Sequence, residues 1–250
     1  MLFRSFGIAQ IEDRYFQNNV IDFDKDKYDK SGYRLFGGSV SFNGSTLNSR
    51  QFPIQGAREA LVAQIFTGNE SFRPGVNSEN KKPVKEKHSW LQLSYMKEKY
   101  HKMGANWILG WYLDAVYASK NFSENYTATM MQASEFAPTA HSKLTYNEAF
   151  RANQYVAAGI RPIYRLNQMF HVRGEFYGFL PIFPIERNSI NKAYYGKAFS
   201  RFEYLGEISV VCQLPFGAIS AYVNHYSSPR REWNVGLTLG WQLFNYRFIE

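Results

Sequence analysis

Large apolar residues alternate with small or polar residues through much of the chain. In "WNVGLTLGWQLF", which begins at Trp233, the positions of Val235, Leu237 and Leu239 are separated by Asn, Gly and Thr residues. Successive side chains of a β-strand point to opposite faces, so a period of two predicts a strand with one apolar and one polar face. A helix would scatter the same residues around its axis.

The same alternation predicts about ten strands, each close to the roughly 9–11 residues that a tilted strand needs to cross a bilayer. The segments are 3–15, 33–44, 57–66, 90–96, 106–117, 154–162, 170–180, 201–214, 218–226 and 233–244. Short turns, such as Leu214 to Gly217, alternate with long polar loops. The sequence therefore predicts an all-β protein with an antiparallel sheet, and a single domain over residues 1–250.

The polar faces of two predicted strands carry charges, while the opposite faces are apolar. In 201–214, Phe202 and Val210 oppose the charged positions. We expect a ladder of charges along a wet barrel lumen, formed by Arg173, Glu175, Arg201, Glu203 and Glu207. A soluble sandwich or lipocalin-like barrel also alternates, but bulky Phe and Trp residues on ten strands would overfill its small interior. This contrast favours a transmembrane barrel.

Composition narrows the function classes. No run of about 18 uncharged apolar residues is present, which excludes a transmembrane helix. The net charge of +8 is spread over loops without a basic helix or a nucleic-acid motif, so we expect no nucleic-acid partner and favour contact with anionic lipid head groups. The single Cys212 and scattered histidines lack metal-ligand spacing, so neither a metal nor a cofactor is expected.

The stretch "FNGSTLNSRQFPIQGAREALV" carries a family resemblance. Its turn residues are Thr46, Leu47, Asn48, Phe52, Pro53 and Gly56, and they resemble the TLD or TLN, aromatic-Pro and Gly turn of BamA-like assembly and translocation barrels of the bacterial surface antigen type. Further similarity begins at Phe150 and continues to the C-terminus. This part is similar to the barrel that follows a patatin-like phospholipase domain in some outer-membrane proteins.

The resemblance implies that the chain supplies the last ten strands of a sixteen-strand barrel. The first six strands, the periplasmic POTRA repeats and the lipase domain would then lie outside it. The final strand resembles the insertion signal that the barrel-assembly machinery recognises, through Asn234, Gly236, Leu239 and Trp241. Implied partners are the lipid bilayer, lipopolysaccharide and an N-terminal passenger, and the implied location is the outer membrane of a Gram-negative bacterium.

The family's assembly members carry an Arg-Gly-aromatic tip in the loop that corresponds to 121–149, and this loop contains no Arg. We still expect the loop to enter the lumen as a plug. Two arrangements of the acidic ladder stay open. A loop cation, Lys143 or Arg151, contacts the acids, or the acids pair with Arg173 and Arg201 across neighbouring strands.

No Gly-x-Ser-x-Gly elbow occurs, so the chain is not expected to be an enzyme. The neighbours Asn224, His225 and Ser227 alternate faces along one strand and are not expected to meet as a triad. The sequence favours a non-enzymatic barrel that anchors or translocates a passenger. The alternatives are a membrane-bound lipase whose catalytic domain lies outside this chain, and a passive porin.

Overall fold

The computed structural model describes residues 2–16, 28–76, 78, 82–215, 217–228 and 233–241, and only the backbone of Trp241. One antiparallel sheet of ten strands dominates it. The strands are β1 (Leu2–Tyr15), β2 (Asp29–Ser45), β3 (Gly56–Arg73), β4 (Val84–Lys102), β5 (Trp107–Ala118), β6 (Gln154–Arg165), β7 (Phe170–Pro181), β10 (Glu203–Leu214), β11 (Gly217–Tyr226) and β12 (Trp233–Trp241).

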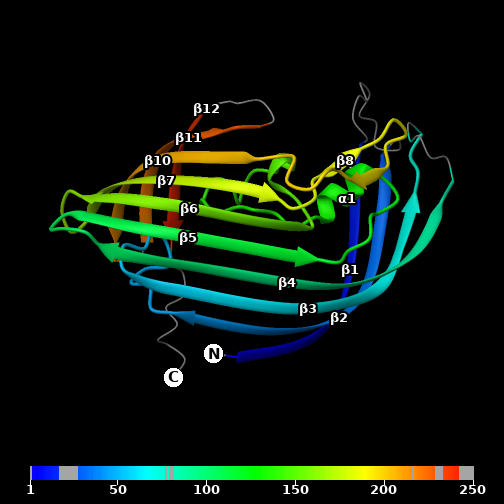
Figure 1. Cartoon of the computed structure of the whole chain (residues 1–250), viewed down its shortest axis with the longest axis horizontal. Coiled ribbons are helices and arrows are strands. Elements are labelled where there is room, and N and C mark those ends of the chain that lie inside the picture. The colour runs from blue at the N-terminus through cyan, green and yellow to red at the C-terminus, as the bar shows by residue number, and fades with distance from the viewer. Residues whose placement is uncertain are drawn as a thin grey trace.

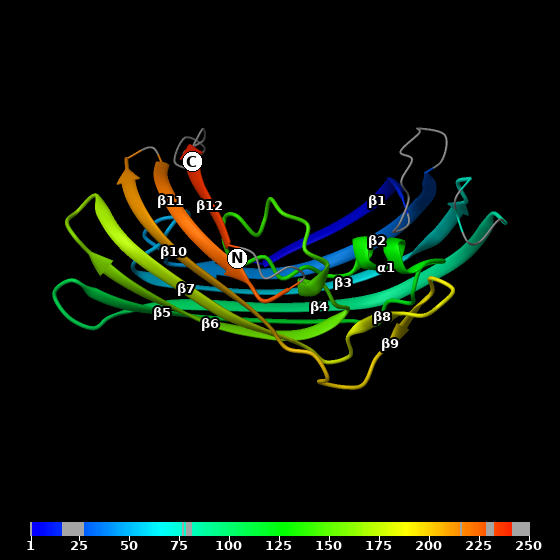
Figure 2. The same ribbon diagram turned by 90° about the horizontal axis from the view of Figure 1, so that it is seen from above.

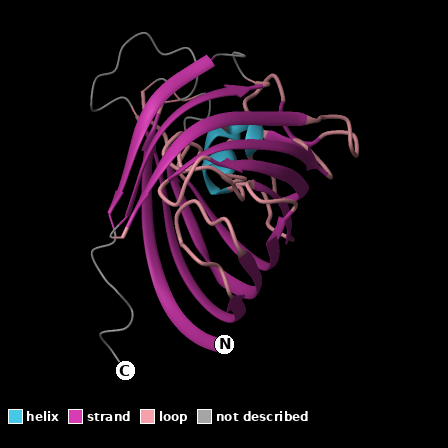
Figure 3. Ribbon diagram, turned by 90° about the vertical axis from the view of Figure 1, so that its left-hand side faces the viewer, coloured by secondary structure: helices cyan, strands magenta, loops and turns pink. Residues whose placement is uncertain are grey.

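Each strand pairs with the next along the chain, so the sheet is a simple meander whose edges are β1 and β12. The sheet curves strongly around one concave side, and the loops and the helix on that side lie within the curve (Figures 1–3). Within the described residues no ladder joins β1 to β12. Curvature of this kind follows from the right-handed twist that accumulates across a long sheet.

The predicted all-β fold and its ten antiparallel strands are confirmed. The main error concerns strand length, because β2, β3 and β4 contain 17, 18 and 19 residues. They continue into 29–31, 72–73 and 84–87, where the sequence predicted loop. Polar residues on both faces hid these extensions, since alternation is visible only where one face is apolar. Residues 242–244 of the last predicted strand lie outside the described part.

Two smaller elements lie in the long loops. A short hairpin of β8 (Ile185–Arg187) and β9 (Ala193–Tyr195) follows β7. The helix α1 (Tyr126–Gln132) lies in the β5–β6 loop, and a 3-10 turn spans Glu148–Phe150. Asn125 caps α1 by accepting the Ala128 amide proton at 2.8 Å. Among the described residues, no helix has the length and apolar character to span a membrane.

The two faces of the sheet have opposite chemistry. On the convex face, side chains such as Val210 and Leu237 are 48% and 80% exposed. On the concave face, Arg173 and Glu207 are 2% and 4% exposed. Phe202, which lies just before β10, is 62% exposed. A water-soluble barrel has the reverse arrangement, with apolar side chains inside and charges outside.

Candidate functional site

The strand register brings polar residues of distant segments into one row across the concave face. Glu98 on β4 lies opposite Tyr112 on β5, and Glu207 on β10 lies opposite both Glu175 on β7 and Asn224 on β11. Asn224 donates to the Glu207 carboxylate at 3.3 Å and accepts from Asn234 on β12 at 3.2 Å. The interior therefore holds a continuous polar band from β4 to β12.

Two arginines form the centre of this band. Arg161 on β6 pairs with Glu98 and donates to the hydroxyls of Tyr177 and Tyr100, each at 2.6 Å. Arg173 pairs with Glu175 on its own strand and donates to Tyr100 at 2.9 Å. The Tyr177 hydroxyl donates to Glu175. Buried charges persist only when such bonds replace their lost hydration, and these five side chains, with Tyr100, replace it for one another.

The turn segment, residues 46–55 between β2 and β3, has a defined local conformation. Asn48 accepts the backbone amides of Ile54 and Gln55 at 3.0 Å each, and Thr46 exchanges backbone and side-chain bonds with Ala57. Gly56 has φ of 93°, and a Cβ there would collide with the Thr46 carbonyl oxygen. Only glycine fits that position without strain. The quoted Asn, Pro and Gly residues thus shape a tight reversal of the chain.

The turn segment folds inward across the concave side. The Pro53 carbonyl oxygen accepts from Arg173 at 2.8 Å, although the two residues are 120 positions apart. Gln213 on β10 donates to Ser49 at 3.3 Å, and a Cβ on Gly240 of β12 would collide with Gln51. The turn segment therefore bridges the β2–β3 end of the sheet to β7, β10 and β12.

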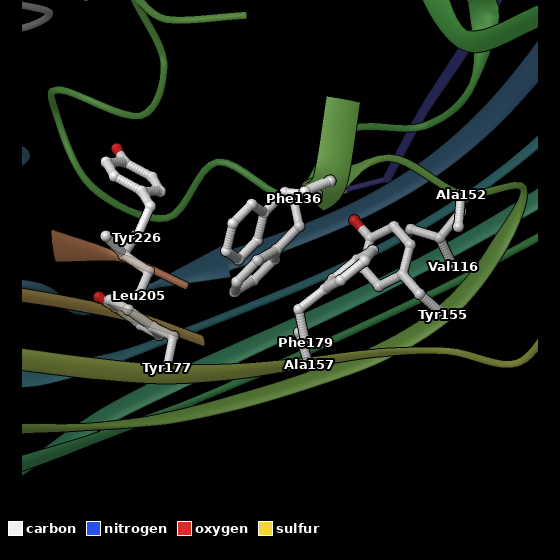
Figure 4. Packing of buried hydrophobic residues seen from close by; sticks show 11 residues of the cluster. Val116, Phe136, Ala152, Tyr155, Ala157, Tyr177, Phe179, Leu205 and Tyr226 are labelled. Atoms are coloured by element: carbon white, nitrogen blue, oxygen red, sulfur yellow. The ribbon is translucent and has the colours of Figure 1, made fainter. Parts of the chain in front are cut away.

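The crossing loop, residues 119–153, covers another part of the concave face through an aromatic cluster. Phe136 from the loop stacks on Phe179 of β7 with ring centroids 5.6 Å apart (Figure 4). Phe150, also from the loop, lies at the same centroid distance from Phe179 in a tilted arrangement. Tyr155 on β6 and Tyr177 also contact the Phe136 ring. All five rings are buried. Apolar burial, and not charge, therefore holds the middle of this loop against the sheet.

Polar contacts tie the crossing loop to strands on both sides of the sheet. Near α1, Asn125 donates to Tyr15 on β1 at 2.7 Å, and Ser123 bonds Tyr33 on β2 at 2.9 Å. At the far side, His141 bonds Tyr226 on β11 at 2.9 Å. The loop therefore spans the concave side from β1 to β11. Burial lowers the pKa of the His141 imidazole.

One further cation stabilises the loop from within. Arg151 donates to the carbonyls of Met131 and Ala133 at 3.1 and 3.2 Å, at the C-terminal end of α1, and pairs with Glu135 at 2.7 Å. A guanidinium hydrogen-bonds helix-terminal carbonyls and interacts favourably with the negative end of the helix dipole.

Lys120 is a second cation at this end of the helix. It donates to the Gln132 carbonyl, and burial lowers its pKa to about 8.

A chamber of about 630 Å³ lies between the turn segment and the crossing loop. Residues such as Gln51 and Pro53 line it from the turn, and Thr139 and Lys143 line it from the loop. Its charged lining residues are Arg50, Arg58, Lys143, Arg161 and Arg173 against Glu98, Glu175 and Glu207. The chamber is thus wet in character, more cationic than anionic, and covered on two sides by segments that are not strands.

The structure brings only part of the predicted charge ladder together. Arg173, Glu175 and Glu207 lie in the interior band. Arg201 stands just before β10, is partly exposed, and pairs with the buried Glu203 at 2.7 Å. Arg173 and Arg201 each pair with an acid two positions away on their own segment, whereas one of the two open arrangements had them pair across neighbouring strands. Neither loop cation has a bond to the ladder acids, within the described part of the chain; Arg151 instead holds α1 and Glu135.

The residues of the insertion-like final strand divide between the two faces. Asn234 joins the polar band, Gly236 lies beneath the Tyr222 hydroxyl, and Leu239 is exposed on the convex face. The side chain of Trp241 lies outside the described part. Asn224 and His225 point to opposite faces, since Asn224 is buried and His225 stacks on Tyr204.

Sequence reasoning missed Arg161, Glu98, Tyr100 and Tyr177 as members of the band. The alternation of β4, β6 and β7 places their side chains on the concave face. Their mutual contacts, however, depend on the register of strands whose residues are up to 63 positions apart. His88 is a further interior residue that the scattered spacing of the histidines did not reveal. It is buried on β4 and bonds Glu70 at 2.8 Å.

Comparisons with protein-family models, curated proteins and solved structures find no match for this chain.

Proposed function

We propose that the chain forms the wall of a transmembrane β-barrel in the outer membrane of a Gram-negative bacterium. The observation that carries the proposal is the inverted polarity of the sheet, with apolar side chains exposed on the convex face and ion pairs buried on the concave face. Lipid hydrocarbon is a suitable surrounding for the apolar convex face, and a water-filled lumen is suitable for the charged concave face. Strand pairing also satisfies the backbone groups between neighbouring strands, which lipid would leave without partners, and the two edges that remain are those of β1 and β12.

Within that membrane, we assign the barrel the role of an anchor or a translocation and assembly pore for an N-terminal passenger, of which a patatin-like phospholipase is the leading candidate. The resemblance of the Thr46–Gly56 turn supports the family, and the two segments across the lumen support a gated interior. A gene segment upstream that encodes a Gly-x-Ser-x-Gly elbow would support the lipase passenger. Lipase activity of this chain alone would overturn the non-enzymatic role.

The membrane assignment is tested by a charge on the convex face. Val210→Arg should make insertion into phosphatidylcholine vesicles less favourable by about 2–4 kcal/mol if Val210 lies near the bilayer midplane. Urea titration of vesicle-bound protein measures it, with Val210→Ile as the matched control. A soluble fold would tolerate this exposed substitution within about 0.5 kcal/mol, and that result would overturn the assignment.

The lumen role is tested by conductance across a planar bilayer. The crossing loop and the turn segment fill much of the interior, so we expect the unmodified protein to conduct weakly. Deletion of 121–149 should open a larger conductance. Strong and steady conductance of the unmodified protein, without any passenger, would instead favour a passive porin.

A further inference from the structure

A histidine and two glutamates converge at the loop end of β3 and β4, outside the polar band. Glu70 on β3 lies directly opposite Glu86 on β4, and His88 is two positions farther along the same strand. The candidate ligand atoms of the three side chains all lie within 4.8 Å of one another. Ligand atoms of one tetrahedral zinc stand roughly 3.3 Å apart, given zinc–ligand distances near 2.0–2.2 Å. The three groups therefore need only a small adjustment to share an ion.

The imidazole of His88 provides a second and independent observation. Its side chain is 4% exposed, and its Nε2 bonds the Glu70 carboxylate at 2.8 Å. Its Nδ1 is buried without any hydrogen-bond partner among the residues the structure describes. The two ring nitrogens of an imidazole point in diverging directions, so Nε2, which faces Glu70, is the nitrogen that would bind an ion shared with Glu70. No hydrogen bond at Nδ1 holds the ring from its other side among the described residues.

The surroundings hold the ligands in place while leaving access from solvent. Tyr33 donates to the second oxygen of Glu70 at 3.2 Å and bonds Ser123 in the crossing loop at 2.9 Å. Bonds of this kind orient a ligating carboxylate. Glu86 is exposed, whereas Glu70 and His88 are buried. An ion could therefore reach the site through the side of Glu86 and keep a water ligand there.

We propose that Glu70, Glu86 and His88 bind a divalent transition-metal ion of the zinc class. A mixed set of imidazole and carboxylate suits zinc and its first-row neighbours, whereas magnesium and calcium select oxygen ligands alone. Because Tyr33 joins Glu70 to Ser123, the bound ion also stiffens the contact between the crossing loop and β2. The inference is independent of the membrane and of any passenger.

The test is a calorimetric titration of the metal-stripped protein in detergent, with Zn²⁺ as the only added ion. We expect one ion per chain. Glu86→Gln should raise the dissociation constant for Zn²⁺ by about tenfold or more. Mutation of residues that only support a metal ligand already lowers metal affinity by about that factor. This exposed position is expected to tolerate the change without unfolding. His101→Gln, on the exposed end of the same strand, is the matched control and should leave binding unchanged.

Co²⁺ absorption supplies a second readout of the same site. The visible bands of the Co²⁺-loaded protein should be displaced by Zn²⁺ and should be lost in His88→Gln. Equal Zn²⁺ affinity in the unmodified protein and Glu86→Gln would overturn the site, as would the absence of stoichiometric binding. In that case the His88–Glu70 bond is only a structural contact.

Discussion

The turn segment and the crossing loop both lie across the concave side, yet they are held by different forces. The turn segment is fastened to the strands by hydrogen bonds, with Arg173 reaching the Pro53 carbonyl, and by Leu47 and Ile54, which pack against a buried apolar cluster on β4, β5 and β6. The crossing loop is fastened by aromatic rings around Phe136 and by polar contacts of Asn125 with Tyr15 and of His141 with Tyr226. A directional bond to a buried guanidinium thus helps to hold the turn segment, whereas stacked aromatic rings hold the middle of the crossing loop.

This difference bears on how a lumen could open. Directional bonds are lost together when one central charge is removed, because its partners stay buried and unpaired. Apolar contacts are lost in proportion to the area withdrawn. We therefore expect the turn segment to leave the sheet in one step. The crossing loop should leave it in stages, and its polar contacts with Tyr15 and Tyr226 should break first.

The largest effect is expected from Arg173→Met. The substitution leaves the buried Glu175 with only the more distant Arg161, at 3.8 Å, and removes the bonds to Pro53 and Tyr100. The free energy of unfolding should fall by about 3–5 kcal/mol, measured by urea titration of the refolded protein. A cysteine at position 49 should become reactive toward a thiol reagent, since the turn segment is released.

A matched control for Arg173 is Arg201→Met, which breaks a pair of the same sequence spacing at a partly exposed position. Its cost should be about 0–1 kcal/mol. Adding Glu175→Gln to Arg173→Met should recover part of the loss, because the unpaired charge is removed. Equal costs for Arg173 and Arg201 would contradict the role of burial.

Phe136→Ala comes next and probes the crossing loop. Removal of a buried phenyl ring costs about 3–5 kcal/mol in a rigid core, and we expect the lower end because the loop detaches locally. Hydrogen exchange should accelerate at 134–150 while the strand amides stay protected. Uniform acceleration over the whole sheet would show that the loop and the sheet unfold as one unit.

Gly56→Ala should have a smaller effect on the turn segment. The substitution places a Cβ against the Thr46 carbonyl at a φ that L residues rarely adopt. Strain of this kind costs about 1–3 kcal/mol, and urea titration measures it. Gly104→Ala, in the β4–β5 turn, meets no atom within 4 Å and serves as the control. Equal losses in both variants would exclude the backbone explanation.

The smallest effect is expected from acidification. Burial lowers the pKa of His141 below 6.5, so the unfolded chain takes up the proton first as the pH falls. The stability contributed by the neutral imidazole is therefore present above pH 6.5 and is lost through the window below it. Hydrogen exchange at 137–147, corrected for intrinsic rates, should rise between pH 7 and 5. His141→Gln should flatten this dependence.

The sequence alone determined where the ten strands lie and which side chains share a face. Both follow from a local rule, because a pleated strand alternates its side chains every residue. Phe202 and Val210 on one side, and Glu203 and Glu207 on the other, were assigned in this way and lie on those faces in the structure. The turn at Gly56 was also readable, since its conformational demand is local.

Only the tertiary structure decided which interior groups meet. Arg161 and Glu98 are 63 positions apart, and Arg173 and Pro53 are 120 apart. Their contacts depend on strand register and on the curvature of the whole sheet, which accumulate from many small twists. The path of the crossing loop from β1 to β11 is of the same kind. No local pattern encodes it, because its anchors gain their energy only after the sheet has curved around them.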